Sequence, residues 1–417
     1  MLRIRRMCWA VLTVFVFVLA ACSGTGGTST PSPTSTRAAT ATPTPRPAPT
    51  TAYLGVGSAI YALDAHSGSQ RWKYDTGQPT TSGGITFTFV DAGTVFFKDS
   101  LGLLFALDAA TGAFRWKLNV HGVPSGLAVV SGVVYVTNNA VQDFPSTYAI
   151  DLRSGTLLWQ KSTGGAMAVT ADAVYLVNAL PGSDVEPVTN GFVRAYNRLT
   201  GVLLWQVEGH PFSGLQYAGG ALYTAADNTL YAYDAHTGAA LWTNAFDSTI
   251  IQSQLVGTTL YLGDRTKVFA FDVTTQKVVW QFAVSYGTLA IGDTMACVAN
   301  HGNLYGLNLT TGAQTWSMQA PNGYSSFTYS GTCYADALSK DHASLYAIDA
   351  TSGKLRWSHD ITYLYNVPRP TADAIYVLSQ DTAQSMASHL IALSTTDGST
   401  LWTFASPSQF PGQFVLG

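Results

Sequence analysis

Apolar and polar residues alternate along most of this 417-residue chain with the period of two that is typical of half-buried β-strands. One twelve-residue pattern recurs nine times. It reads aromatic or apolar residue, Ala, apolar residue, Asp or Asn, two residues, Ser or Thr, Gly, three residues, Trp. The copies recur about every 41 residues, a period that indicates a propeller, solenoid or array. They end at Trp72, Trp116, Trp159, Trp205, Trp242, Trp280, Trp316, Trp357 and Trp402.

Each copy has the chemistry of a β-hairpin. The Asp or Asn side chain can accept hydrogen bonds from backbone N–H groups of the turn, and Gly supplies a positive φ without steric cost. The Trp of the second strand buries about 150–250 Å², so nine of them predict a large structural core. The departures are Arg194 at the first position, Gly306 in place of Ala, Ser394 in place of Asp or Asn, Asp397 in place of Ser or Thr, and Gln276 in place of Gly.

Two further strands precede each hairpin, as in the run LAVVSG, VVYVTN, STYAID and TLLWQK. Four short antiparallel strands per repeat predict an all-β propeller with four-stranded blades. A β-solenoid is the alternative, although its repeats are usually shorter. The first unit lacks its first strand and begins at residues 53–57, while residues 413–416 form a lone strand at the other end. We expect this last strand to complete the first blade and close the ring, which removes exposed sheet edges.

The first 21 residues have the features of a secretory signal peptide. Arg3, Arg5 and Arg6 precede an apolar run from 8 to 19 that is shorter than the approximately 20 residues of a membrane span. Residues 19–22, Leu-Ala-Ala-Cys, resemble the lipobox of bacterial lipoproteins. The resemblance implies cleavage before Cys22 and a lipid on its sulfur. An ordinary signal peptide that leaves Cys22 as a spare thiol is the alternative.

Residues 22–52 read as a lipidated cysteine followed by a linker, and 53–417 as the propeller. Residues 23–52 contain ten Thr, six Pro and four Ser and no large apolar side chain, so they cannot form a core. The Pro-rich part favours an extended tether of about 3.1 Å per residue. Its composition is also compatible with glycosylation.

Charge and composition exclude some functions. Only 11% of residues are charged, and 21 Lys and Arg against 24 Asp and Glu give a net charge of −3. A nucleic-acid-binding domain would carry a basic patch, so we expect no nucleic-acid partner. Hydrophobic residues at 47% provide enough apolar material for a large core.

The spacing Ala-x-Asp-x-x-Thr-Gly-x-x-x-Trp resembles the tryptophan-docking repeat of the pyrroloquinoline-quinone-like propellers, over residues 53–417. The family implies eight blades, whereas the motif count gives nine, and both remain open at this stage. It also implies two functional classes. One is the quinoprotein dehydrogenases, and the other is non-catalytic scaffolds such as the lipoprotein of the outer-membrane β-barrel assembly machinery.

The dehydrogenases need parts that this sequence does not supply. The resemblance implies a Ca²⁺ ion held by oxygen ligands, an Asp base and usually a disulfide between adjacent cysteines. This chain has no Cys-Cys pair, only two Glu residues, and many of its Asp residues at the repeat turns. It also has no Cys-x-x-Cys-His haem motif. We therefore expect no cofactor, no metal and no catalytic residue. A divergent quinone- and Ca²⁺-dependent dehydrogenase of alcohols or sugars is the alternative.

Cys297 and Cys333 lie on the second strands of neighbouring repeats. Neighbouring blades stack through opposite faces, which makes a bond between these strands difficult. Two buried thiols are the favoured interpretation, and a disulfide is the alternative.

Function usually lies on variable loops over a rigid scaffold. The longer loops, which join the second strand to the third and one blade to the next, are expected on one face of the ring. Their aromatic residues could anchor a partner, or could simply cap the blade ends. The sequence thus predicts a monomeric, lipid-anchored extracytoplasmic propeller, on the cell membrane or outer membrane, that binds a protein or cell-envelope polymer without catalysis. The candidate binding residues are Phe144, His210, Phe212, Tyr324, Tyr363 and Tyr365.

Overall fold

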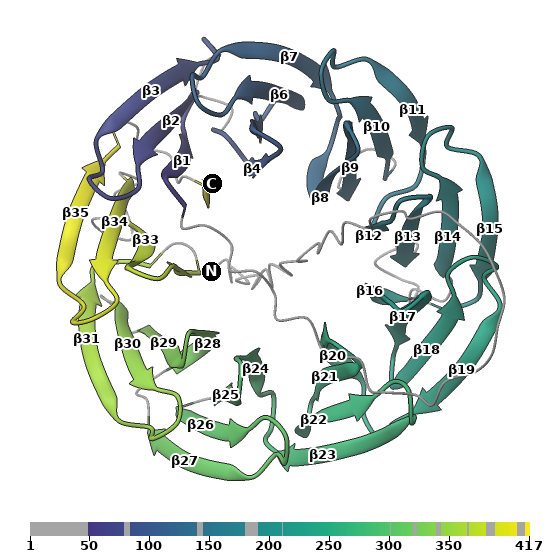
Figure 1. Cartoon of the computed structure of the whole chain (residues 1–417), viewed down its shortest axis with the longest axis vertical. Coiled ribbons are helices and arrows are strands. Elements are labelled where there is room, and N and C mark those ends of the chain that lie inside the picture. Colours follow the sequence, from purple (N-terminus) through teal and green to yellow (C-terminus); the bar gives the residue numbers. More distant parts are fainter. Residues whose placement is uncertain are drawn as a thin grey trace, which may run out of the picture.

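Nine four-stranded antiparallel sheets surround a central axis in the described part of the chain (Figure 1). The computed structural model describes residues 49–78, 84–139, 145–179, 191–210, 212–300, 302–319, 323–338, 343–364, 367–380, 388–406 and 413–417. Over these residues all regular elements are strands. The propeller is confirmed, as is the count of nine, and the expectation of eight blades is wrong. Each Trp-ended hairpin forms the outer half of its own sheet, so the repeats and the blades correspond one to one.

Blades are numbered in chain order, and their strands are given from the axis outwards. Blade 1 contains β36 (Gln413–Leu416), β1 (Thr51–Val56), β2 (Ala59–Asp64) and β3 (Gln70–Asp75). Blade 2 contains β4 (Phe87–Asp91), β5 (Thr94–Lys98), β6 (Leu103–Asp108) and β7 (Phe114–Asn119). Blade 3 contains β8 (Val123–Val130), β9 (Val133–Asn139), β10 (Thr147–Asp151) and β11 (Leu157–Lys161). Blade 4 contains β12 (Ala166–Val169), β13 (Ala173–Ala179), β14 (Gly191–Asn197) and β15 (Leu203–Glu208).

The remaining blades repeat this order. Blade 5 contains β16 (Ser213–Ala218), β17 (Ala221–Ala226), β18 (Thr229–Asp234) and β19 (Ala240–Ala245), and blade 6 contains β20 (Ile250–Val256), β21 (Thr259–Asp264), β22 (Lys267–Asp272) and β23 (Lys277–Ala283). Blade 7 contains β24 (Thr288–Ile291), β25 (Met295–Asn300), β26 (Asn303–Asn308) and β27 (Gln314–Gln319). Blade 8 contains β28 (Gly323–Tyr329), β29 (Thr332–Leu338), β30 (Ala343–Asp349) and β31 (Leu355–Ile361), and blade 9 contains β32 (Arg369–Pro370), β33 (Ala374–Gln380), β34 (Ser388–Ser394) and β35 (Thr400–Ala405).

The two ends of the described chain close the ring together. The C-terminal strand β36 pairs antiparallel with β1, with Phe414 opposite Leu54, and becomes the innermost strand of blade 1. Backbone N–H groups of Thr50 and Thr51 both donate to the carbonyl of Gly417 at 3.0 Å. The predicted closure is therefore confirmed, and the first strand begins at Thr51.

The hydrophobic core lies between neighbouring blades. The two middle strands of a blade are covered on both faces, so β2 is buried along almost its whole length, whereas the outermost strand β3 is largely exposed. Side chains from facing sheets form separate clusters, such as the one that joins Tyr135 of blade 3 to Val174 of blade 4. Ring stability therefore depends on a series of similar blade junctions.

Eight of the nine tryptophans dock onto the hairpin turn of the next blade. The indole of Trp116 is buried, and its Nε1 donates to the Leu152 carbonyl at 2.8 Å. Gly155 of the same turn lies against this indole, since a Cβ there would come within 2.5 Å of Trp116 Cγ. Such a bond is formed by Trp72, Trp116, Trp159, Trp205, Trp280, Trp316, Trp357 and Trp402, in each case with the residue that follows the Asp, Asn or Ser of the next turn.

One junction departs from this arrangement. Gln276 takes the place of the docking glycine in the turn that follows Trp242, and it adopts a positive φ of 57°. The ring of Trp242 lies 5.7 Å from that of Phe271 on the neighbouring blade.

Among the described residues, no helix is long and apolar enough to cross a membrane.

Candidate binding surface on the loop face

The ring has two faces with different chemistry. On one face, which we call the turn face, the short turns within each blade meet: Leu152 N–H of blade 3 donates to the Gly132 carbonyl at 2.9 Å. On the other, the loop face, the longer connections meet: Val120 N–H donates to the Gly102 carbonyl at 3.0 Å. The predicted grouping of turns and loops is therefore confirmed.

The carboxylates of the turn face stabilise the hairpins. Asp108 accepts hydrogen bonds from the backbone N–H groups of Ala110 and Thr111, and from Arg115 at 2.9 Å. The Arg115 and Thr111 donors lower the pKa of Asp108 to about 2. The equivalent side chains of Asp64, Asp151, Asn197, Asp234, Asp272, Asn308 and Asp349 accept the same pair of backbone bonds.

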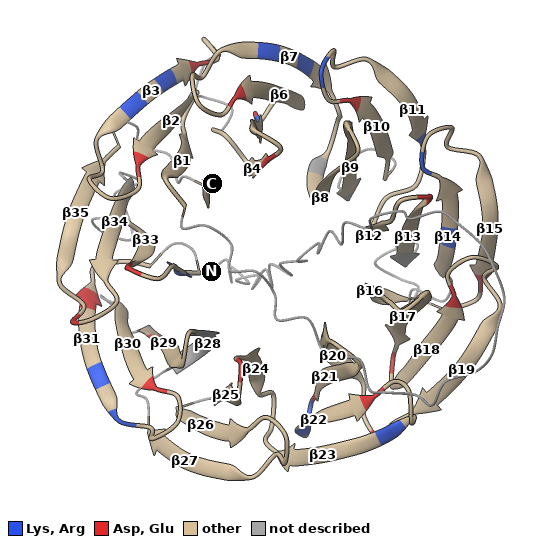
Figure 2. Ribbon diagram, viewed as in Figure 1, with Lys and Arg blue, Asp and Glu red and all other residues tan. Residues whose placement is uncertain are grey.

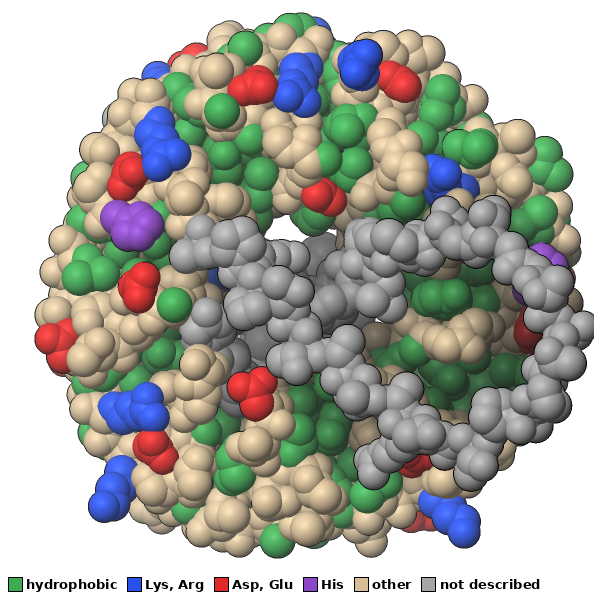
Figure 3. Space-filling view, in the orientation of Figure 1, with side chains coloured by type: hydrophobic (Ala, Val, Ile, Leu, Met, Phe, Trp, Pro, Cys, Tyr) green, Lys and Arg blue, Asp and Glu red, His purple; other side chains and the backbone are tan. Residues whose placement is uncertain are grey.

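Ion pairs reinforce three of these turns. Arg71 pairs with Asp64 at 2.7 Å and Arg356 with Asp349 at 2.6 Å, in the same way as Arg115 with Asp108. Blue segments on the outer strands β3, β7 and β31 therefore lie close to red turns (Figure 2), and blue and red side chains are neighbours around the face drawn in Figure 3. A low-pKa carboxylate held by turn donors is unsuited to act as a general base near pH 7.

Among the described residues, no group of three or more His, Cys, Asp or Glu side chains is placed to hold a metal ion.

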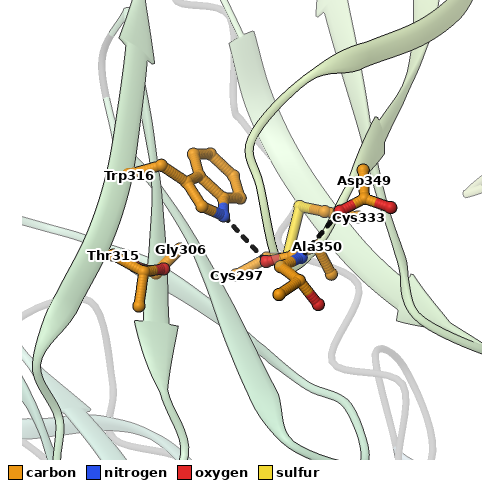
Figure 4. The surroundings of a disulfide bond; sticks show 8 residues. Cys297, Gly306, Thr315, Trp316, Cys333, Asp349 and Ala350 are labelled. Carbon is orange, nitrogen blue, oxygen red and sulfur yellow. Dashed lines mark hydrogen bonds between the residues drawn. A yellow bond between two sulfur atoms is a disulfide. The ribbon is translucent and has the colours of Figure 1, made fainter.

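Cys297 and Cys333 form a disulfide, so the favoured interpretation of two thiols is wrong (Figure 4). Their Cα atoms lie 6.1 Å apart, and both residues are fully buried. The two strands do stack through opposite faces. However, Cys297 lies on the face of β25 that meets blade 8, and Cys333 on the face of β29 that meets blade 7, so both belong to one core cluster.

The candidate aromatic residues divide into exposed and buried side chains. His210 is exposed, with its ring 5.0 Å from that of Tyr231. Phe212 is only 2% exposed, packed edge-on against Tyr231 and Tyr233. Its N–H donates to the His210 carbonyl at 2.8 Å. The prediction that Phe212 is an exposed anchor is therefore wrong. Its buried ring lies against His210 and supports that exposed side chain instead.

Tyr363 remains accessible, with 43% of its surface exposed, and its carbonyl accepts a hydrogen bond from Gln380 N–H. It lies between β31 and β32, whereas His210 lies between β15 and β16 on the opposite side of the ring (Figure 1). The structure does not bring these two side chains into one site. Tyr324 belongs to β28, and nothing is described of its side chain; Phe144 and Tyr365 lie outside the described residues, as does Cys22.

Charged residues that the sequence did not single out lie near the loop face and the axis. Asp264, at the end of β21, is fully buried and lies 3.3 Å from Lys267 Nζ. Burial raises its pKa, but hydrogen bonds from Thr266 and Lys267 outweigh this and leave it lowered. Arg369 lies on the innermost strand β32, 6.0 Å from the Phe414 ring, and desolvation lowers its pKa.

Fold and motif together define a pyrroloquinoline-quinone-like β-propeller. More specifically, the family described as outer membrane protein assembly factor BamB matches residues 56–184, 189–322 and 327–415. The chain belongs to this family, and the resemblance seen in the sequence is confirmed.

Individual relatives are more distant. The serine/threonine-protein kinase AfsK of Streptomyces coelicolor is 31% identical over 123 residues, which are 28% of this chain and 14% of the kinase. The chain thus spans about a seventh of that protein's length.

Among solved structures, one titled as the eukaryotic initiation factor has a TM-score of 0.63 at 11% identity, covering 87% of this chain and 98% of its own. Quinohemoprotein alcohol dehydrogenase from Comamonas testosteroni has a TM-score of 0.51 at 14% identity, covering 86% of this chain and 70% of its own. These likenesses show the fold alone.

Proposed function

We propose that this chain is a membrane-tethered, non-catalytic propeller that binds another protein or a cell-envelope polymer through its loop face. The observation that carries the proposal is the match to the BamB family along nearly the whole propeller. That family is named for an assembly factor, which is a binding role and not a chemical one.

The use of polar side chains supports this role. Acids on the turn face are bonded to turn N–H groups, as for Asp108. The longer loops of the other face carry accessible aromatic groups such as Tyr363. A rigid ring that presents variable loops is suited to recognition.

The disulfide supports export from the cytoplasm. Disulfides form and persist in oxidising compartments, and Cys297 and Cys333 are joined in a fully buried position. This agrees with the signal peptide and lipobox-like sequence ahead of Cys22. We infer that the chain is exported and held by a lipid at Cys22, on a linker of some 30 residues.

Lipid attachment is tested by changing Cys22 to alanine. Cells fed an alkyne-bearing fatty acid should label the wild-type protein, and Cys22→Ala should lose essentially all of that label. The variant should also move from the detergent-rich phase to the aqueous phase when the two are separated, because one or two acyl chains dominate the partition. Equal labelling of both proteins would contradict the anchor.

Use of the loop face is tested by photocrosslinking in cells. His210 and His236 are a matched pair: both are exposed histidines of the blade 5 region, one before β16 on the loop face and the other in the β18–β19 turn. A photoreactive amino acid at position 210 should give a discrete adduct, and the same amino acid at position 236 should give little. Tyr363 provides a second loop-face position.

Two results would contradict the proposal. Equal adducts from positions 210 and 236 would mean that the loop face is not the recognition surface. Saturable heat in a calorimetric titration of the purified full chain with pyrroloquinoline quinone and Ca²⁺, followed by dye reduction with alcohols or sugars, would show catalysis instead.

A further inference from the structure

Eight of the nine blades carry an aromatic ring at one position of their second strand. The ring stands opposite the Ala of the repeat, as Tyr53 stands opposite Ala62. It packs against the Trp of its own blade, with ring centroids between 5.8 and 6.1 Å apart in every case. These rings are Tyr53, Phe96, Tyr135, Tyr175, Tyr223, Tyr261, Tyr334 and Tyr376.

Several of these tyrosines form a clamp across the junction together with the Trp. The Tyr135 hydroxyl and Trp159 Nε1 both donate to the Arg198 carbonyl of the next blade, at 3.0 and 2.9 Å. The same pair of hydrogen bonds, from a tyrosine hydroxyl and a tryptophan Nε1 to one carbonyl, joins blade 1 to Ala109 and blade 9 to Ala65. The aromatic position thus fastens one blade to the next.

Blade 7 is the exception, because Cys297 takes the aromatic position opposite Gly306. The Ala of the repeat is missing from the same place, since a Cβ on Gly306 would overlap the Trp316 indole. Trp316 therefore lies over the glycine backbone, and its Nε1 still donates to the Ala350 carbonyl at 2.7 Å (Figure 4). Three departures from the repeat, two in sequence and one in indole placement, occur together at this junction.

Cys333 occupies the position that the aromatic ring normally meets. In other junctions the ring shares a core cluster with the apolar residue just before the next blade's aromatic residue. Tyr223 meets Leu260 in this way, and Tyr334 meets Ile375. Cys333 directly precedes Tyr334, so the disulfide joins two positions that are in contact around the ring.

We propose that the Cys297–Cys333 disulfide is a covalent replacement for the tyrosine clamp, and that it makes the junction between blades 7 and 8 dependent on oxidation. A dithiol reductant that reaches the bond would supply two electrons and two protons. The sulfur–sulfur bond then breaks into two thiols, and the reductant becomes a disulfide. The junction would keep the Trp316 hydrogen bond but have neither a covalent link nor a tyrosine at position 297, and it becomes the weakest point of the ring.

The first test converts this junction to the ordinary kind with the variant Cys297→Tyr, Gly306→Ala, Cys333→Val. The full chain is refolded from urea with or without dithiothreitol, and amide hydrogen exchange is followed by mass spectrometry. In the wild type, reduction should raise exchange in β24–β31 by about tenfold or more relative to blades 2–4, because local opening controls exchange there. The Tm of the reduced wild type should lie about 5 °C below that of the oxidised wild type, because the cysteines are 36 residues apart in the sequence.

The triple variant should show neither change on reduction, and its exchange should match that of the oxidised wild type. The control Cys297→Ala, Cys333→Val has no clamp and should behave like the reduced wild type. If the triple variant loses protection as the control does, a tyrosine does not substitute for the disulfide and the proposal is wrong. Unchanged exchange in the reduced wild type would overturn it equally.

A second variant keeps the test decisive if the first fails to fold. The changes Tyr261→Cys, Ala270→Gly and Ala296→Cys are designed to add a second disulfide at the junction between blades 6 and 7, where Tyr261 and Ala296 share a cluster. Alkylation without reductant should count no more free thiols than in the wild type. Two additional free thiols would show that the paired positions are not equivalent around the ring, which the proposal requires.

Discussion

Replacing Trp116 by alanine should lower the free energy of unfolding by about 4 kcal/mol, because truncation of a buried Trp typically costs about 3–5 kcal/mol. The indole is 5% exposed, lies 6.0 Å from the Phe96 ring and donates to Leu152 of the next blade. Its loss removes contacts within blade 2 and the bond to blade 3 together. Urea unfolding of the full chain, followed by circular dichroism, measures the change.

The control is Trp116→Phe, which keeps an aromatic ring but cannot donate to Leu152. It should cost about 1–2 kcal/mol, the value of one hydrogen bond and a small loss of packing. A result in which phenylalanine costs as much as alanine would place the stabilisation in the hydrogen bond and not in burial. A loss below about 1 kcal/mol for Trp116→Ala would show that a blade junction does not depend on its tryptophan.

Much of the fold could be predicted because each blade repeats its local chemistry. The Asp, Gly and Trp of a hairpin determine a turn, a positive φ and a docking ring, so the sequence motif marks each outer strand pair. The count of nine was correct because it depends on these residues. The expected eight came from the family, which constrains the architecture but not the number of copies.

The disulfide could have been predicted from the sequence. Assigning the two cysteines to strands was not enough, because their positions within those strands also had to be compared. Adjacent residues of a strand point to opposite faces. The aromatic residue of one blade therefore meets, across the junction, the residue that directly precedes the aromatic residue of the next blade. Cys297 occupies the aromatic position, and Cys333 comes just before Tyr334. Alignment of the second strands on their aromatic residues would have paired the two cysteines.

The loop face was harder to predict, because its loops follow no repeat. Phe212 lies in a variable loop, and its burial depends on Tyr231 and Tyr233, which are distant in the sequence. His210, two residues earlier, is exposed although its ring lies only 5.7 Å from that of Phe212. Local patterning does not contain that information, since exposure there is set by tertiary contacts.

Replacing Gly155 by alanine should cost about 3 kcal/mol although it adds only one methyl group. The residue has a φ of 72°, which costs an alanine about 1–2 kcal/mol. The new Cβ would lie 2.5 Å from Trp116 Cγ, and overpacking of this kind adds about 1–3 kcal/mol. Gly132→Ala is the matched control, because its φ is 78° and a Cβ there meets nothing within 4 Å.

The two terms can be separated because the second one requires the indole. Gly132→Ala should cost only the backbone term, about 1 kcal/mol. In a Trp116→Ala background, Gly155→Ala should cost no more than that, which corresponds to a coupling of about 2 kcal/mol between positions 116 and 155. Equal costs for Gly155→Ala and Gly132→Ala in the wild-type background would show that the turn can move away from the ring. Docking of tryptophan onto glycine would then tolerate a side chain.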